Sequence, residues 1–337
     1  MKDSEKKPGY VGIREIARMA GVSTATVSRV INRPEKTSPK VREQVEKIIE
    51  EYQYVPNQAA RNIFSKTSNS IALFVYDMEN PFFVSLIRAI NKLCLKKNLT
   101  LLICATEDDA EQEKEYLEYC ISNRCAGIIL TEGCNYKIFE PYRDKIPLIF
   151  LDRRSHGHYS SVSSNNRESL ARVVDYLYNL NHRRIGFIGC KKDLDSVKAR
   201  QKGYLQGLTA HSLSIQKEYI YENNTELSLS AGKEALNYFL SLPKPPTSII
   251  CCADIVALGI LNQAAVQNIK IPDELSIVGF DNVLDNLHSP PITTVRQNVD
   301  AMAAALIEMI LSPPDPPIFE IVETTFIPGT TCQKTTN

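Results

Sequence analysis

The chain has 337 residues, which is longer than one compact core of ordinary size, so the sequence predicts two or three domains. Its hydrophobic share of 43% and charged share of 23% are those of a soluble globular protein, and 39 basic residues balance 39 acidic ones. No uninterrupted apolar stretch approaches the roughly 20 residues that span a bilayer, which excludes a membrane-spanning protein.

The nine cysteines form no recognisable framework. Their number is odd, their spacing is irregular and no CxxC pair occurs, so neither a disulfide scaffold nor a metal site is expected. The N-terminus is charged and has no apolar run behind it, which predicts that no signal peptide is present. We therefore expect a cytoplasmic protein with reduced thiols, no metal, no cofactor and no membrane partner.

Charge is distributed unevenly along the chain. Residues 1–66 carry thirteen Lys or Arg and eight Asp or Glu, a net charge of +5 that the remaining residues offset with −5. A basic head on an acidic remainder predicts that the head alone meets a polyanion.

Three short helices are expected in the first 52 residues. The first ends at Gly21 and has its apolar positions at helical spacing, namely Ile13, Ile16, Ala17 and Ala20. The second has an apolar face made of Val27, Val30 and Ile31. The third starts at Pro39, with Ser38 as N-cap, and its inward positions are Val41, Val45, Ile48, Ile49 and Tyr52. Two short helices around a tight turn, covered by a third, indicate a helix-turn-helix domain.

The polar face of the second helix has the chemistry of a surface that reads DNA. This face holds no acidic residue between positions 24 and 33, and its members are Thr24, Ala25, Thr26, Ser28, Arg29 and Asn32. Small hydroxyl side chains can approach a phosphate backbone closely, and a single Arg can bind guanine bidentately. A solvated helix face is the alternative interpretation. The missing acids and the three-helix context favour DNA binding.

The stretch from Ile13 to Phe64 resembles the head of LacI-type (lactose/galactose repressor) regulators. Residues 20–32 carry that family's "AGVSxxTVSRxxN" signature, and residues 54–61 carry its "YxPNxxAR" signature. The resemblance implies that Thr24 and Ala25 read bases and that Arg29 contacts a base or a phosphate. It implies phosphate-positioning roles for Ser23, Thr26, Ser28 and Asn32. The expected DNA-contacting set is completed by Lys36, Asn57, Arg61 and Ile63.

Residues 57–67 are expected to be a hinge helix and linker between a DNA-binding domain at 1–56 and a core at 68–337. Asn57 caps about two helical turns, a length that is marginal in water. In the resembled family, two such hinges lie in the minor groove and wedge an apolar side chain, here Ile63, into the central base step. Two hinges on two half-sites imply a homodimer bound to a pseudo-palindromic operator. A plain linker helix is the alternative.

Apolar runs alternate with helical patterns in the rest of the chain. The expected strands are 70–76, 99–106, 125–131, 147–152, 184–190, 219–222, 247–253 and 275–280. The expected helices are 82–96, 110–123, 166–180, 198–210, 230–241 and 254–268. This alternation predicts an α/β core of parallel sheets in two Rossmann-like lobes. The family resemblance implies a core like a periplasmic sugar-binding protein, with lobe 1 at about 68–160 and 293–318 and lobe 2 at about 161–292 and 319–332.

Polar side chains at strand ends are candidates for a ligand site between the lobes. Carboxylates and one Arg around a cleft suit the paired hydroxyls of a polyol, and an aromatic ring can stack on it. The resemblance implies that the effector contacts are Phe82 or Phe83, Asp152, Ser196, Arg200 and Asp281. Asp254 is expected to be a helix N-cap instead. Ala253 and Leu227 stand where the family often places an Asn and an aromatic ligand contact, which leaves the identity of the ligand open.

Three classes of function compete. An enzyme has little support, because the chain lacks GxGxxG, GxxxxGK[ST] and any recognisable triad, and no catalytic residue is expected. A transport binding protein fits the core but not the basic head. The sequence therefore predicts a homodimeric transcription regulator that represses carbohydrate-utilisation genes and responds to a small-molecule effector, expected to be a sugar. A co-repressor-dependent or activating regulator that senses a non-sugar metabolite is the alternative.

Overall fold

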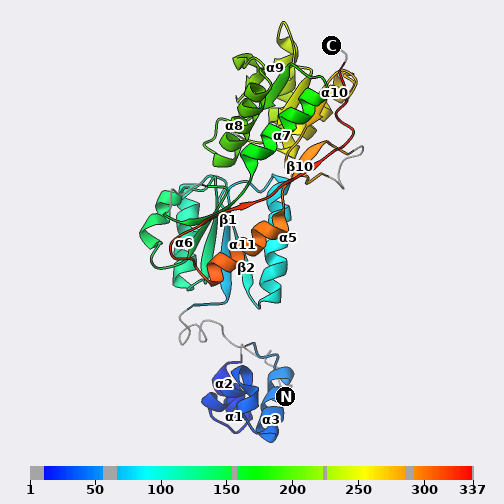
Figure 1. Ribbon diagram of the computed structural model, residues 1–337. Coiled ribbons are helices and arrows are strands. Elements are labelled where there is room, and N and C mark those ends of the chain that lie inside the picture. The colour runs from blue at the N-terminus through cyan, green and yellow to red at the C-terminus, as the bar shows by residue number, and fades with distance from the viewer. Residues whose placement is uncertain (1–10, 56–66, 154–157, 223–225, 285–290, 336–337) are drawn as a thin grey trace. The chain divides into compact units, whose positions relative to one another are not determined.

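The computed structural model describes residues 11–55, 67–153, 158–222, 226–284 and 291–335. The chain forms two compact units, residues 1–66 and 67–337. The described part of the first unit is helical, and the second is an α/β body with parallel sheets (Figure 1). This confirms the predicted fold class. The finer division at residues 56/57 and 67/68 stays a prediction, because residues 56–66 lie outside the described ranges.

The first unit contains α1 (Ile13–Met19), α2 (Thr24–Asn32), a 3-10 turn (Pro34–Lys36) and α3 (Pro39–Glu51). Its core is formed by small and branched apolar side chains from all three helices, with one aromatic residue: Ile16, Ala17, Ala20, Val27, Val30, Val45 and Tyr54. The expectation that Tyr52 packs inward is wrong, because this side chain is 41% exposed. Helix α3 ends at Glu51, and the left-handed backbone of Gln53 (φ 47°) turns Tyr54 into the core instead.

The turn between α1 and α2 depends on backbone geometry that glycine adopts easily. Gly21 has φ +60°, and the next amide, of Val22, donates to the carbonyl of Ala17 at 3.0 Å. Gln44 of α3 closes over this turn by donating to the carbonyl of Ala20 at 3.1 Å. Gly12 is the N-cap of α1, and its amide donates to the Glu15 carboxylate at 3.0 Å. This bond is the Glu15 half of a capping box, and it stabilises the helix start although Gly12 has no side chain to supply the other half.

The first lobe of the second unit is built on a six-stranded parallel sheet with the order β11-β5-β4-β3-β1-β2. Its strands are β1 (Ser70–Val75), β2 (Thr100–Ala105), β3 (Gly127–Thr131), β4 (Leu148–Leu151), β5 (Ser160–Ser164) and β11 (Phe319–Val322). Its helices are α5 (Pro81–Lys96), α6 (Ala110–Ser122) and α11 (Val299–Leu311), with 3-10 turns at Tyr136–Ile138 and Glu140–Tyr142. Helices α5 and α11 pack against each other, and α11 covers β3, β4 and β5.

The second lobe is built on a four-stranded parallel sheet with the order β7-β6-β8-β9. Its strands are β6 (Ile185–Ile188), β7 (Ile220–Tyr221), β8 (Ser248–Cys251) and β9 (Ser276–Val278). Its helices are α7 (Asn166–Asn179), α8 (Asp195–Ala210), α9 (Leu229–Ser241) and α10 (Asp254–Val266), with a 3-10 turn at Lys217–Tyr219. Helix α7 packs against α8, and α9 packs against α10. No helix in the described ranges is long and apolar enough to cross a membrane.

The chain passes between the lobes after β5, between β9 and α11, and after β11. Strand β10 (Thr294–Arg296) lies in the second of these segments and pairs antiparallel with β12 (Thr325–Ile327) in the third. Strands β5 and β11 pair with each other in the first sheet. Residues 161–164 and 319–322 therefore lie in the first lobe, which corrects the expected assignment of both segments to lobe 2. The sequence pattern misses β5 because "SSVSS" has no apolar run, although all five residues are buried.

Candidate functional site

Helix α2 presents a compact polar surface. Ser23 is its N-cap, and the Ser23 hydroxyl accepts a hydrogen bond from the amide of Thr26 at 3.1 Å. Val27 and Val30 are buried against the other helices. The predicted DNA contacts on this unit are exposed or half-buried: Ser23, Thr24, Ala25, Thr26, Ser28, Arg29, Asn32 and Lys36. The three predicted contacts Asn57, Arg61 and Ile63 lie outside the described residues.

The side chains of Asn32 and Arg29 on this surface differ in whether other residues hold them in place. The Asn32 amide donates to the Ser28 carbonyl at 2.8 Å and to the Ser28 hydroxyl at 3.2 Å, so it is held along the helix. Arg29 is exposed and forms no ion pair within the described ranges. Its guanidinium is therefore available to a nucleic-acid base or phosphate.

In the second unit, one cavity between the lobes collects all six predicted effector residues. It is lined by Tyr76, Asn80, Phe82, Phe83, Thr131, Glu132, Leu151, Asp152, Ser196, Arg200, Leu227, Asp281 and Gln297. The space open to the centre of a water molecule is only about 20 Å³, enough for about one water. The lobes are thus closed over the cavity, and they must separate to admit a molecule of sugar size.

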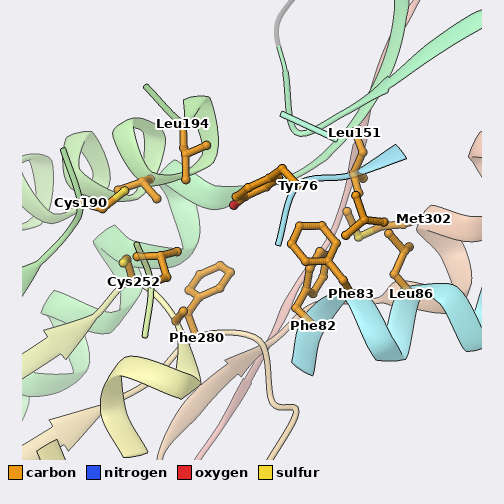
Figure 2. Packing of buried hydrophobic residues seen from close by; sticks show 14 of the residues in the cluster. Tyr76, Phe82, Phe83, Leu86, Leu151, Cys190, Leu194, Cys252, Phe280 and Met302 are labelled. Atoms are coloured by element: carbon orange, nitrogen blue, oxygen red, sulfur yellow. The ribbon is translucent and has the colours of Figure 1, made fainter. Parts of the chain in front are cut away.

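The first lobe contributes residues that follow the carboxyl ends of its strands. Tyr76 follows β1, Glu132 follows β3 and Asp152 follows β4. Asn80 caps α5 by accepting from the amide of Phe82 at 3.0 Å, which places Phe82 and Phe83 in the first turn of that helix. Figure 2 shows the rings of Tyr76, Phe82 and Phe83 on one side of this region and Phe280 of the second lobe on the other.

The second lobe contributes a single cation. Arg200 lies on α8 one turn after Ser196 and is 4% exposed. Its Nε donates to Asn166 Oδ1 at 2.8 Å, its Nη1 donates to the carbonyl of Cys252, and its guanidinium lies 3.7 Å from the centroid of the Phe280 ring. Nη1 also lies 3.9 Å from Oδ1 of Asp281, which forms a buried ion pair. These contacts fix the guanidinium at the wall of the cavity.

Two of the acidic residues have unusual backbone conformations. Asp152 has φ 59° and Asp281 has φ 113°, a region that residues other than glycine rarely adopt. Each carboxylate is held by a neighbour: Ser163 donates to Asp152 Oδ1 at 2.7 Å, and Gln297 donates to Asp281 Oδ1 at 2.7 Å. Strained backbone that the surroundings hold in place is typical of ligand sites.

A carboxylate joins the two lobes across the cavity. Glu132 of the first lobe accepts hydrogen bonds from the amide of Ser196 at 2.9 Å and from its hydroxyl at 2.5 Å. The acceptor thus sits at the start of α8, where the helix dipole also favours a negative charge. Opening the lobes breaks both hydrogen bonds.

Burial dominates the electrostatics of the cavity. Burial first, and then the neighbouring Asp152 carboxylate, raises the pKa of Glu132 to about 8. Burial also raises the pKa of Asp281 to about 7, although the nearby Arg200 lowers it, and burial raises the pKa of Asp152. At neutral pH the closed cavity therefore holds protons on part of its carboxyl groups.

The raised pKa of Glu132 predicts a falling stability with rising pH. A carboxyl group whose pKa is higher in the folded than in the unfolded chain stabilises the fold while it is protonated, and this stabilisation is lost as the pH rises towards the folded pKa. We expect the melting temperature to fall by about 2 °C between pH 7 and 8.5, a window above the ordinary pKa of histidine. Buried thiols, whose pKa is also raised by burial, contribute to the same fall, so the assignment depends on the difference between variants. Glu132→Gln should show a smaller fall than the exposed control Glu115→Gln, which should match the unsubstituted protein. A melting temperature that rises over this window would contradict the assignment.

Sequence reasoning missed several residues of the cavity. Glu132 directly follows a predicted strand, so the rule that selected Asp152 could have found it. Gln297 enters from the crossing segment after β10, and no local pattern marks it. Asp254 is the first residue of α10 rather than its N-cap, which is Ala253. Its carboxylate accepts from the Thr294 hydroxyl at 2.6 Å and from the amide of Val283 at 2.9 Å, and thereby braces the crossing segment.

Gly133 is required for the position of Tyr76. A Cβ atom at Gly133 would lie 2.2 Å from the Tyr76 ring, closer than any side chain allows. We expect Gly133→Ala to lower the melting temperature by several degrees, because the buried ring must move. In a Tyr76→Ala background, Gly133→Ala should lower the melting temperature much less. A double-mutant cycle followed by thermal unfolding tests this, and additive effects would show that the two residues are not coupled.

Comparisons with known proteins find relatives of both units of the chain. The family model described as "Bacterial regulatory proteins, lacI family" matches residues 12–57, and the model described as "Periplasmic binding protein-like domain" matches residues 174–332. The transcriptional repressor CytR of Escherichia coli (strain K12) is 32% identical over 299 residues, which cover 87% of this chain and 87% of CytR.

Solved structures show the same fold. The lac repressor dimer bound to operator and the anti-inducer ONPF is 21% identical, with a TM-score of 0.83, covering 96% of this chain and 100% of the repressor. A LacI family transcriptional regulator from Enterococcus faecalis V583 with bound ribose is 28% identical, with a TM-score of 0.68, covering 79% of this chain and 99% of that one.

Proposed function

Because the chain belongs to the lacI family of bacterial regulatory proteins, we propose that it is a DNA-binding transcription repressor whose operator affinity is controlled by a small molecule held between the two core lobes. The observation that carries the DNA-binding part is α2, which buries Val27 and Val30 and exposes Arg29 among small polar side chains. The protein acts as a cytoplasmic homodimer on two half-sites and is not an enzyme.

The proposed effector site is the cavity lined by Phe82, Phe83, Asp152, Ser196, Arg200 and Asp281. Its carboxylates and guanidinium suit paired hydroxyl groups, and the ribose-bound relative supports a sugar-like ligand. Ligand entry separates Glu132 from Ser196 and changes the relation of the lobes. Strand β1 begins at Ser70, shortly after the linker, and Tyr76, the residue that follows it, lines the cavity, which offers a direct route from ligand to hinge.

The test has two stages. The full chain is first used to select DNA from a random-sequence library, and the selected DNA is footprinted. We expect a protected site with two symmetric halves. A thermal-shift screen of sugars and related metabolites then identifies ligands, whose effect on operator affinity is measured by fluorescence anisotropy. We expect an affinity change of about tenfold or more. Selection of no common sequence, or a cavity ligand that leaves operator affinity unchanged, would contradict the proposal.

A further inference from the structure

The cavity has an excess of buried negative charge. Among its described lining residues, three carboxylates face one guanidinium: Glu132, Asp152 and Asp281 against Arg200. The carboxylate residues are 7%, 6% and 4% exposed, so water screens them poorly. Taking unpaired ions out of water is costly, and a buried group without a counter-charge keeps its proton instead. The raised pKa values of Glu132 and Asp281 fit that state.

Arg200 is poorly placed to bind an anionic ligand. Its Nε and Nη1 donate to Asn166 and to the Cys252 carbonyl, and one face of its guanidinium lies against Phe280. Bidentate binding of a phosphate or carboxylate needs two parallel N–H donors. The guanidinium has five N–H donors, of which these bonds use two. Nη1 also lies 3.9 Å from the Asp281 carboxylate, so an anion that bound Nη1 and Nη2 together would compete with that ion pair. An incoming anion would also meet the three carboxylates.

The approach to the cavity has the same sign of charge. A groove of about 710 Å³ between the lobes shares Tyr76 and Leu227 with the cavity. Its described lining includes five acidic residues and one Lys: Asp77, Glu79, Glu107, Asp108, Glu226 and Lys192. The Lys192 ammonium pairs with Asp108 and lies 4.2 Å from the centroid of the Tyr76 ring. The groove therefore attracts cations and repels anions on the way in.

We propose that the effector is a polyhydroxylated molecule that carries a protonated amine, and that the cleft excludes phosphorylated and acidic sugars. This rests on the proposed function, because it names the ligand class of the same cavity. The hydroxyl groups bond to the carboxylates and to Arg200 Nη2, while the ammonium group supplies the counter-charge that the cavity lacks. A neutral sugar can form the hydroxyl hydrogen bonds, but it does not supply the positive counter-charge.

Three small probes of similar shape and different charge test the proposal. They are tris(hydroxymethyl)aminomethane, which is cationic at pH 7, neutral pentaerythritol, and anionic 2,2-bis(hydroxymethyl)propionate. Thermal shifts of the full chain are measured at constant ionic strength in a phosphate buffer. We expect the cationic probe to bind at least tenfold more tightly than the neutral one, and the anion not to bind. The variant Asp281→Asn should lose the preference for the cation, whereas exposed Glu115→Gln should keep it.

Equal or tighter binding of pentaerythritol, binding of the anion, or no stabilisation by any of the three probes would overturn the proposal. A second series of glucosamine, glucose and glucose 6-phosphate separates this outcome from failure of the proposed function. If neutral glucose binds the cavity better than glucosamine and changes operator affinity, the charge inference fails and the regulatory function stands. If glucosamine binds preferentially but operator affinity does not change, the charge inference stands and the regulatory function fails.

Discussion

Replacing Arg29 by alanine is expected to reduce specific operator affinity by about 100-fold. A bidentate contact with guanine contributes about 1–3 kcal/mol, and a dimer on two half-sites loses this contact twice. Ala25, a position that the family resemblance assigns to base reading, has no polar group that could compensate. The side chain of Arg29 is exposed, so the melting temperature should not change. Fluorescence anisotropy with the selected operator and with a scrambled duplex measures both specific and nonspecific binding.

Arg42→Ala is the matched control for the loss of charge. Arg42 is exposed on α3 and pairs with Glu46 at 2.7 Å, so its removal takes one positive charge from the same unit. We expect only a small loss of affinity that is similar for operator and scrambled DNA. An equal loss of specific binding in both variants would show that Arg29 acts through charge and does not read a base.

Replacing Arg200 by methionine is expected to destabilise the core by about 3–5 kcal/mol and to abolish the response to the effector. The substitution removes the hydrogen bonds to Asn166 and to the Cys252 carbonyl, and it leaves Asp281 without its buried partner. Operator binding should persist, because the first unit is unchanged. Thermal unfolding and anisotropy with and without ligand measure the two effects separately.

The loss of stability caused by Arg200→Met should depend on pH. Because the carboxyl groups around it can take up protons, the destabilisation should be smaller at pH 6 than at pH 8. The double variant with Asp281→Asn should recover part of the stability at pH 8, since it removes the unpaired charge. Equal destabilisation at both pH values, with no recovery in the double variant, would mean that Arg200 contributes through packing alone.

The helix-turn-helix surface could be derived almost entirely from local sequence. Its helices are set by apolar spacing, by Ser23 as an N-cap and by Gly21 in the turn, and each of these signals acts within a few residues. The one error, at Tyr52, arose where α3 ends and helical periodicity no longer applies. Short-range physics therefore decides which side chains α2 exposes.

The cavity was only partly accessible from the sequence. Strand ends converge at one edge of a parallel sheet, so Asp152 could be proposed from the strand before it. Strand β5 could not be predicted from the sequence, because its buried serine side chains form hydrogen bonds with residues that are distant in the chain. Ser164 donates to Gln297 at 2.6 Å, and the Ser160 hydroxyl accepts from the amide of Ile318 at 3.2 Å.

The sequence by itself determined the helical head, the alternation of strands and helices, and the residue types at the strand ends, because periodicity, capping and turn residues act locally. The tertiary structure alone decided which sheet receives β5 and β11, and that Glu132 and Gln297 join Asp152, Arg200 and Asp281 around one cavity. These outcomes depend on where the chain crosses between the lobes. The charge balance of the site follows from them, since it is set by which carboxylates the crossings bring together away from water.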